Sequence, residues 1–174
     1  MNIAIKNGLL MAATLIACYF GAYFISPTAN ANSLITIPLF TTIGLALICL
    51  TIWQFKSKSQ DVITFGESYI NGFLTFTVGI TVFLVLTYVH YKMDANYAEL
   101  ITEFQKDQAI EMMKKMTEQF NMKGADFDEA MAQIEETDMS MGIGTFILRL
   151  LSNIMWGAIL ALGGGIFGNI IKNK

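Results

Sequence analysis

Four long apolar runs, separated by polar stretches, divide the chain into predicted membrane spans. They cover about residues 8–25, 34–55, 69–91 and 150–171. A helix needs about 20 mostly apolar residues to cross the hydrocarbon core of a bilayer, because lipid offers no partner to an unpaired backbone group. Aromatic side chains stand near the ends of these runs, as in the interfacial belts of membrane proteins: Tyr19, Tyr23, Trp53, Tyr69, Tyr88, Tyr91 and Trp156. The pattern predicts an all-α membrane protein with four transmembrane helices.

This pattern divides the chain into three parts. Residues 1–91 hold the first three predicted spans, residues 92–149 form a polar segment, and residues 150–174 hold the fourth span and a basic tail. The connecting stretches 26–33 and 56–68 are too short to form domains. The segment 92–149 is therefore the only sizeable region expected outside the lipid.

The first run also resembles an export signal. Leu15-Ile16-Ala17-Cys18 fits a lipoprotein cleavage box, and Ala29-Asn30-Ala31 fits a signal-peptidase site. The apolar core of a signal peptide usually runs about 7–15 residues, whereas this run continues past Cys18 through Phe24. We expect a retained helix, and cleavage would remove one helix without changing the orientation of the others.

Positive charges in the short connections predict the orientation. Cytoplasmic loops carry an excess of lysine and arginine, whereas charges in long loops count weakly. With four spans, one side of the membrane receives Lys6, Lys56, Lys58, Lys172 and Lys174. The opposite 26–33 loop has no positive charge. This distribution predicts a multi-pass protein of the bacterial inner membrane with both termini in the cytoplasm and residues 92–149 outside.

The outer segment has a helical pattern of its own. Between residues 94 and 121 apolar side chains recur at steps of three and four in two sets: Tyr97, Ile101 and Phe104, and later Ala109, Met113, Met116 and Phe120. Glu111 and Lys115 form an i,i+4 pair on the polar face. Lys123-Gly124 is a helix stop, and Asp126-Phe127-Asp128-Glu129 resembles a capping box that opens a second, shorter helix. The segment is therefore predicted to be an extracytoplasmic amphipathic helical hairpin between the third and fourth spans.

Composition and charge exclude one class of partner. The chain is 54% hydrophobic and only 14% charged, against about 25% charged in soluble domains. Twelve of the 14 acidic residues lie between Asp94 and Asp138, so residues 93–141 carry twelve acids against four lysines, a net charge of −8. Such a block repels nucleic acid and anionic lipid headgroups. We expect the lipid bilayer, and another membrane protein or a second copy of this chain, as partners, and no nucleic acid.

Metal and cofactor sites are not indicated. Cys18 and Cys49 lie inside apolar runs, where buried cysteine acts as a small hydrophobic residue. Eight of the 11 methionines lie in residues 93–141, and thioethers suit Cu(I), but no His or Cys joins the one close cluster, Met112, Met113 and Met116. The acids lack the alternating-oxygen spacing of an EF-hand. We therefore interpret the methionines as packing or partner contacts, and expect no metal and no cofactor.

Polar residues at the edges of the spans are the candidates for a transport path. Glu67 opens the third span, Asn71 lies one turn deeper, His90 closes that span, and Arg149 stands just before the fourth. Ionisable groups inside a membrane mark ion or substrate pathways, but none of these lies near a span centre. We interpret them as a membrane-edge polar site and expect it to anchor the spans, with the arginine reaching the headgroups.

Small residues recur at helical spacing in two spans. Ala13, Ala17 and Gly21 step by four in the first span, and the same spacing in the fourth gives Gly157, Ala161 and Gly165. Such rows let helix backbones approach closely in lipid. They predict tight helix packing, either within one chain or between copies.

No arrangement of residues points to catalysis. The single histidine, His90, has no serine-containing elbow or carboxylate motif beside it. We therefore expect no enzyme, and interpret the chain as a non-catalytic accessory or scaffold subunit of the cell envelope. The alternative is a small solute transporter or channel that acts as a homo-oligomer, with a path along Glu67, Asn71 and Arg149.

Two short motifs carry a resemblance to a known family. Phe65-Gly66-Glu67-Ser68 precedes the third span, and Tyr88-Val89-His90-Tyr91-Lys92-Met93-Asp94 leaves it. With the polar helical segment and the glycine-rich last helix that follow, the chain resembles DUF4199, an uncharacterised bacterial membrane family. Its members commonly have proline after that aspartate, whereas Ala95 stands here. The resemblance implies four membrane helices and a role in the cell envelope, and carries over no activity or site.

Overall fold

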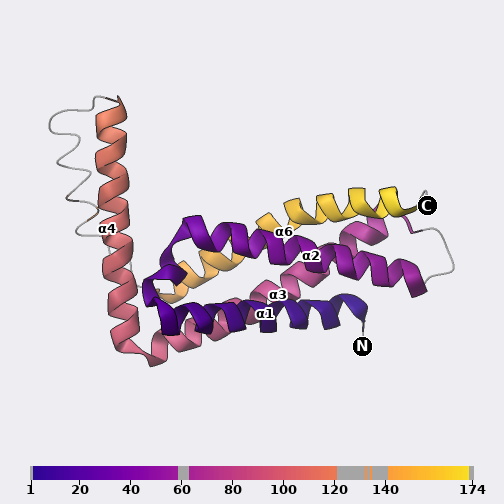
Figure 1. The fold of residues 1–174 in the computed structure, drawn as a ribbon, viewed down its shortest axis with the longest axis horizontal. Helices are drawn as coiled ribbons and strands as arrows, with labels where there is room; N and C mark the ends of the chain where they lie inside the picture. The colour runs from indigo at the N-terminus through magenta and orange to yellow at the C-terminus, as the bar shows by residue number, and fades with distance from the viewer. Residues whose placement is uncertain (1, 59–62, 121–131, 133, 135–140, 173–174) are drawn as a thin grey trace.

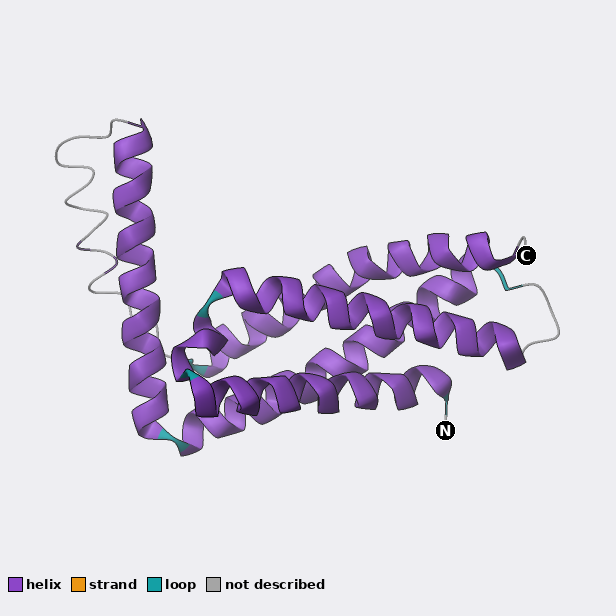
Figure 2. Cartoon of the chain, viewed as in Figure 1, coloured by secondary structure: helices purple, strands orange, loops and turns teal. Residues whose placement is uncertain are grey.

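The computed structural model describes residues 2–58, 63–120, 132, 134 and 141–172. Almost all of them are helical, and no strand occurs among them. Figures 1 and 2 show the elements in chain order: α1 (Ile3–Ile25), the short 3-10 helix η1 (Pro27–Ala31), α2 (Ser33–Lys58), α3 (Phe65–Met93), α4 (Ala95–Phe120) and α6 (Ile143–Lys172).

Four helices are long and apolar enough to cross a membrane: Ile3–Ile25, Leu34–Lys58, Phe65–Met93 and Ile143–Ile171. The protein is therefore a multi-pass membrane protein, and the predicted all-α architecture with four spans is confirmed. Most helices extend past the apolar runs, because backbone groups also pair within a helix in the headgroup region. One example is the capping box at the start of α3, where the Thr64 and Glu67 side chains each bond the other's backbone N–H.

The start of α6 corrects one expectation from the sequence. Arg149 was placed just before the fourth span, but α6 begins at Ile143 and Arg149 lies inside it. The charge of Arg149 marked the start of the predicted apolar run, but the residues that precede it already belong to the helix. Phe146 N–H already donates to the carbonyl oxygen of Gly142 (3.0 Å). The charge therefore lies along a membrane helix and not in the connection before it.

The bundle is organised around α3. This helix contacts α1, α2, α4 and α6, whereas α1 and α6 share no contact among the described residues. Figure 1 shows that α1 begins and α6 ends at one end of the bundle, and that α4 crosses the other end, roughly perpendicular to the spans. If the spans cross the bilayer, α4 therefore runs along the plane of its surface.

A single apolar core joins all four spans. Its buried members are Met11, Leu15, Ile48, Ile52, Phe76, Ile80, Phe83 and Leu160. Lipid tails are as apolar as these side chains, so close packing rather than escape from water stabilises the bundle. The ring of Phe76 occupies the space left by two glycines, Gly44 of α2 and Gly157 of α6.

Helices α1 and α3 touch backbone to backbone. A Cβ atom at Gly8 would lie 2.8 Å from the carbonyl oxygen of Thr75, and one at Gly79 would lie 2.9 Å from the carbonyl oxygen of Gly8. Real Cβ atoms are essentially never that close to another atom. Glycine at both positions is therefore what allows the two helices to meet.

The two predicted rows of small residues lie in different surroundings. In α6, Gly157, Ala161 and Gly165 are on the buried face, against α2 and α3. In α1, Ala13, Ala17 and Gly21 are exposed, and a Cβ at Gly21 would meet nothing within 4 Å. Tight packing of the second row therefore remains a prediction about a contact with another molecule.

The turn between α3 and α4 is built on one carboxylate. Asp94 ends α3, and its Oδ1 accepts from the backbone N–H of Tyr97 in the first turn of α4 (3.0 Å). Its Oδ2 accepts from the hydroxyl of Tyr23 on α1 (2.8 Å). Both hydrogen bonds hold the pKa of Asp94 below its usual value, and the bond from Tyr97 has the larger effect. The carboxylate thus stabilises the start of α4 and attaches it to α1.

This geometry predicts an acid-sensitive contribution to stability. Because the pKa of Asp94 is lowered in the folded state, its contribution is fully present above the unfolded value of about 3.9 and is lost as the pH falls through the folded value. The midpoint temperature of thermal unfolding should be lower at about pH 3 than at about pH 6. The decrease should be smaller in D94N. Equal drops in the two proteins would contradict this role.

The predicted outer hairpin is only partly within the described residues. Its first arm is present as α4, a 26-residue helix, and Lys115 Nζ lies 2.6 Å from Glu111 Oε1 as the pattern predicted. The helix stop at Lys123-Gly124 and the capping box at 126–129 lie outside the described residues. The second arm remains a prediction.

Candidate functional site

A cavity of about 300 Å³ lies at the α4 end of the bundle. Its walls come from every described helix, with α1, η1, α2, α3 and α6 around it and α4 across it. Phe40 and Phe83 close its deep end with an edge-to-face contact at 5.1 Å between ring centroids. This volume is at the lower limit of the range of small-ligand pockets.

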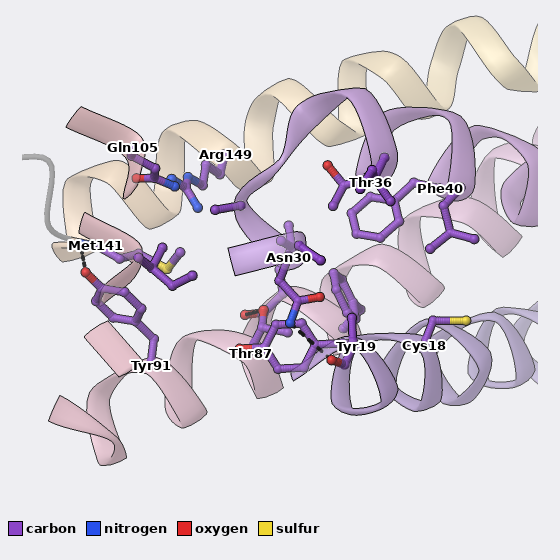
Figure 3. A pocket seen from close by; sticks show the side chains of 18 of the residues that line it. Cys18, Tyr19, Asn30, Thr36, Phe40, Thr87, Tyr91, Gln105, Met141 and Arg149 are labelled. Atoms are coloured by element: carbon purple, nitrogen blue, oxygen red, sulfur yellow. Dashed lines mark hydrogen bonds between the residues drawn. The ribbon is translucent and has the colours of Figure 1, made fainter. Parts of the chain in front are cut away.

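The polarity of the lining changes along the cavity. Figure 3 shows Gln105 and Arg149 together at one end, and Cys18 and Phe40 at the other. Arg149 is half-buried, and Asn153 lines the cavity one helical turn further along α6. Asn153 Nδ2 donates to the carbonyl oxygen of Arg149 (2.8 Å). The cavity therefore has a cationic and amide-bearing end and an apolar end.

Hydrogen bonds fix the wall between the two ends. Asn30 of η1 donates through Nδ2 to the carbonyl oxygen of Tyr19 (3.1 Å), which holds η1 against α1 (Figure 3). The hydroxyl of Tyr91 accepts from the backbone N–H of Met141 (3.2 Å) and lies 2.9 Å from Thr102 Oγ1 of α4. Together these contacts attach η1, α4 and the start of α6 to the rest of the bundle, so the lining is held in place from several sides.

His90 belongs to an aromatic cluster beside the cavity and does not line it. Its Nδ1 lies 2.9 Å from the hydroxyl of Tyr19, and its ring packs against four others at centroid distances of 5.0 to 5.6 Å: Tyr19, Phe20, Tyr23 and Tyr97. These partners account for the position of the imidazole as a contact between α1, α3 and α4.

Glu67 and Asn71 lie at the opposite end of α3. Glu67 Oε2 accepts from the N–H and the hydroxyl of Thr64, both at 2.8 Å, and Asn71 Nδ2 donates to the carbonyl oxygen of Glu67 (2.8 Å). Both residues are thus bonded within their own helix and its cap. At 1.5 Å per residue, Glu67 lies about 35 Å along the helix axis from His90. The four membrane-edge residues therefore do not form one site, and of these only Arg149 lines the cavity.

Comparison with known proteins gives the chain a family. The family model described as "Protein of unknown function (DUF4199)" matches residues 6–169. The chain belongs to the DUF4199 family. This confirms the resemblance seen in its motifs, with the match extending across Ala95. No curated protein and no solved structure matches the chain. Any role for the cavity of this DUF4199 protein must therefore be argued from its geometry.

A second group of polar side chains lies buried near the other end of the bundle. Asn7 Nδ2 donates to Thr51 Oγ1 and to Gln54 Oε1, both at 3.0 Å, and Thr75 Oγ1 lies 3.1 Å from Thr51 Oγ1. The Asn7 amide group thereby uses both of its protons. Hydrogen bonds satisfied in this way indicate a contact that joins α1, α2 and α3, not a binding site.

No sequence pattern predicted this cluster. Asn7 stands just before the first predicted span. Thr51 and Thr75 are single threonines within apolar runs, and threonine is common in membrane helices. A neighbouring hydroxyl, Ser68 Oγ, is buried without a partner among the described residues and faces Gly168.

Removing the shared hydroxyl tests the structural role of the cluster. In T51V the Asn7 amide loses an acceptor, and we expect the free energy of unfolding in detergent to fall by about 1 kcal/mol. T14V is the matched control, because within the described part of the chain the Thr14 hydroxyl bonds only the carbonyl oxygen of Leu10 in its own helix (2.9 Å). Equal values for the two variants would show that the interhelical bonds contribute nothing.

The described residues lack the ligand sets that hold metal ions. Among the described residues no group of three or more His, Cys, Asp or Glu side chains lies close enough to hold an ion. Cys18 and Cys49 are free thiols. On α4, Met112 and Met116 are exposed and Met113 is half-buried. The expectation that this DUF4199 protein binds no metal therefore remains a prediction.

Proposed function

We propose that this DUF4199 protein is a non-catalytic accessory or scaffold subunit of a bacterial cell-envelope complex, which binds its partner through α4. The observation that carries this proposal is the position of α4 across the end of the spans (Figure 1). The helix spans about 39 Å, so much of it extends past the bundle. Among its described side chains, the large apolar ones that are exposed are Leu100 (40% exposed), Met112 (66%) and Met116 (41%).

The interior of the bundle supports a binding role over transport. Below the cavity, the ring of Phe83 meets Phe40, and the core continues through Ile80 and Phe76. A solute passing along the bundle would have to displace these side chains. The buried polar group nearest the other end, around Asn7, is already bonded to its neighbours.

The charge distribution supports an inner-membrane orientation with both termini in the cytoplasm. Helix ends at the end of the bundle opposite α4 carry Lys6, Lys56, Lys58 and Lys172. Positive residues in short segments favour the cytoplasmic side. In this orientation α4 and its methionines are presented outside, where another envelope protein has access to them.

The test is purification of the tagged full chain from native membranes in a mild detergent, followed by mass spectrometry. We expect another membrane protein in fixed stoichiometry. The variant M112E/M116E should lose it, because two carboxylates replace exposed apolar contacts. K114E is the matched control, since it changes the net charge of α4 by the same amount at an exposed position.

Two results would overturn the proposal. One is a protein that purifies alone from both the wild-type and the variant membranes. The other is a purified protein that moves a solute across reconstituted vesicles without a partner, which would support a transporter or channel instead.

A further inference from the structure

The cavity under α4 is amphipathic and carries one cation. Its cationic end holds Arg149 and Gln105, and Phe40 lies at the other end (Figure 3). The amide of Asn153, bonded to the carbonyl oxygen of Arg149, and the apolar side chains of Leu39 and Leu84 also line the cavity. Among the residues that the structure describes, no aspartate or glutamate lines it. Such a lining matches a molecule with one anionic group and an apolar body.

Arg149 lacks a counter-charge in the described part of the chain, where no hydrogen bond or ion pair of its guanidinium is formed. A charged side chain at membrane depth is costly and usually pairs with another group. The planar guanidinium offers two parallel donors to a phosphate or carboxylate, and such bonds strengthen where water is excluded. This cation, which has no counter-charge among the described residues, is therefore the feature of the cavity that indicates a ligand.

The surroundings of the cavity identify lipid as the source of that ligand. Ile35 lines the cavity and is 52% exposed, so the apolar wall opens onto the outer surface of α2. On α6, Ile147 and Leu148 beside Arg149 are also exposed, which places lipid next to the cavity when the spans are in a membrane. The acyl chain of a phospholipid can enter the cavity from the side while its headgroup stays at the end of the spans.

From this geometry we infer that the cavity binds one anionic phospholipid of the adjacent leaflet. The phosphate lies on Arg149, and the first part of an acyl chain lies along Leu39, Phe40 and Leu84. At about 300 Å³ the cavity takes only that part of the lipid, and the rest of the chain leaves past Ile35 into the bilayer. The inference rests on the cavity alone and stands whether or not α4 binds a partner.

The acidic outer segment does not oppose this binding. None of its described acids lines the cavity. Asp94 is bonded at the turn before α4, and the others lie on α4, where solvent and salt screen them. The charge of Arg149 acts at contact distance in a partly enclosed site, where the interaction is stronger. The acidic segment repels anionic surfaces in general, whereas one lipid reaches the arginine from within the membrane plane.

The experiment uses the full chain in nanodiscs of phosphatidylcholine that contain a trace of photoactivatable phosphatidylglycerol. After illumination, mass spectrometry measures the labelled fraction and the labelled peptides. We expect labels on α2 and α6 around the cavity, and at least fivefold less with a photoactivatable phosphatidylcholine probe. R149Q should lower phosphatidylglycerol labelling at least fivefold, whereas K92Q should not, because Lys92 is a cation at the same end of the bundle outside the cavity.

A second variant separates the cavity from the charge. T36F leaves Arg149 in place but fills the cavity beside Phe40, and should lower labelling as strongly as R149Q (Figure 3). Thermal unfolding checks that each variant is folded. Equal labelling by the two probes, or labelling that survives in folded R149Q or T36F, would overturn the inference. Loss of labelling in excess inorganic phosphate would show an anion site without lipid specificity and would overturn it too.

Discussion

Leucine at Gly8 is expected to destabilise the bundle of this DUF4199 protein by forcing α1 away from α3. A Cβ there would lie 2.8 Å from both the carbonyl oxygen of Thr75 and Cβ of Val78. Neither atom is the end of a flexible side chain, so α1 must move away from α3. Overpacking of this kind costs about 3 kcal/mol. Unfolding of the purified variant in mixed detergent micelles measures the loss.

Gly21 provides the control on the same helix. A Cβ at this position would meet nothing within 4 Å, so G21L should change the free energy of unfolding by less than about 0.5 kcal/mol. If G8L were as stable as G21L, the close contact of α1 and α3 would be wrong. If G21L were the more damaging variant, its row with Ala13 and Ala17 would be the important interface.

Truncation of Phe76 to alanine is expected to lower the free energy of unfolding by about 3–5 kcal/mol, as for other buried aromatic side chains. Phe76 is 1% exposed, and its ring lies between α2 and α6. It occupies the space that a side chain at Gly44 or Gly157 would need. Its removal leaves a void that neither glycine can fill. The same detergent unfolding measurement applies.

Phe24 is the matched phenylalanine, because it is 79% exposed near the end of α1. F24A should change the free energy of unfolding by less than about 0.5 kcal/mol. A small effect of F76A, close to that of F24A, would mean that the core joining α2, α3 and α6 is not packed as described.

The sequence alone determined the membrane architecture, and the reason is physical. Lipid requires every backbone group to pair within the chain, so each span must be a long apolar helix that a hydropathy pattern reveals. The amphipathic spacing from Tyr97 onward likewise predicted α4, whose two faces meet different surroundings. The motifs around Glu67 and His90 were sufficient to suggest the family. All of these signals are local along the chain.

The candidate site was not visible in this way. Its lining brings together residues as far apart in sequence as Cys18 and Asn153, from every described helix. A pattern along one helix shows that a face is apolar but not which neighbour covers it. For that reason the sequence grouped Arg149 with Glu67 and Asn71, which the fold places at the other end of the bundle.

Only the tertiary structure decided which small residues matter for packing. Ala13, Ala17 and Gly21 have the regular spacing of a helix contact, yet the contact of α1 with α3 is made by Gly8. Spacing establishes that a small face exists, whereas the crossing point of two helices depends on both partners at once. The pairing of Gly8 with Gly79 and the cavity under α4 are properties of the assembled bundle.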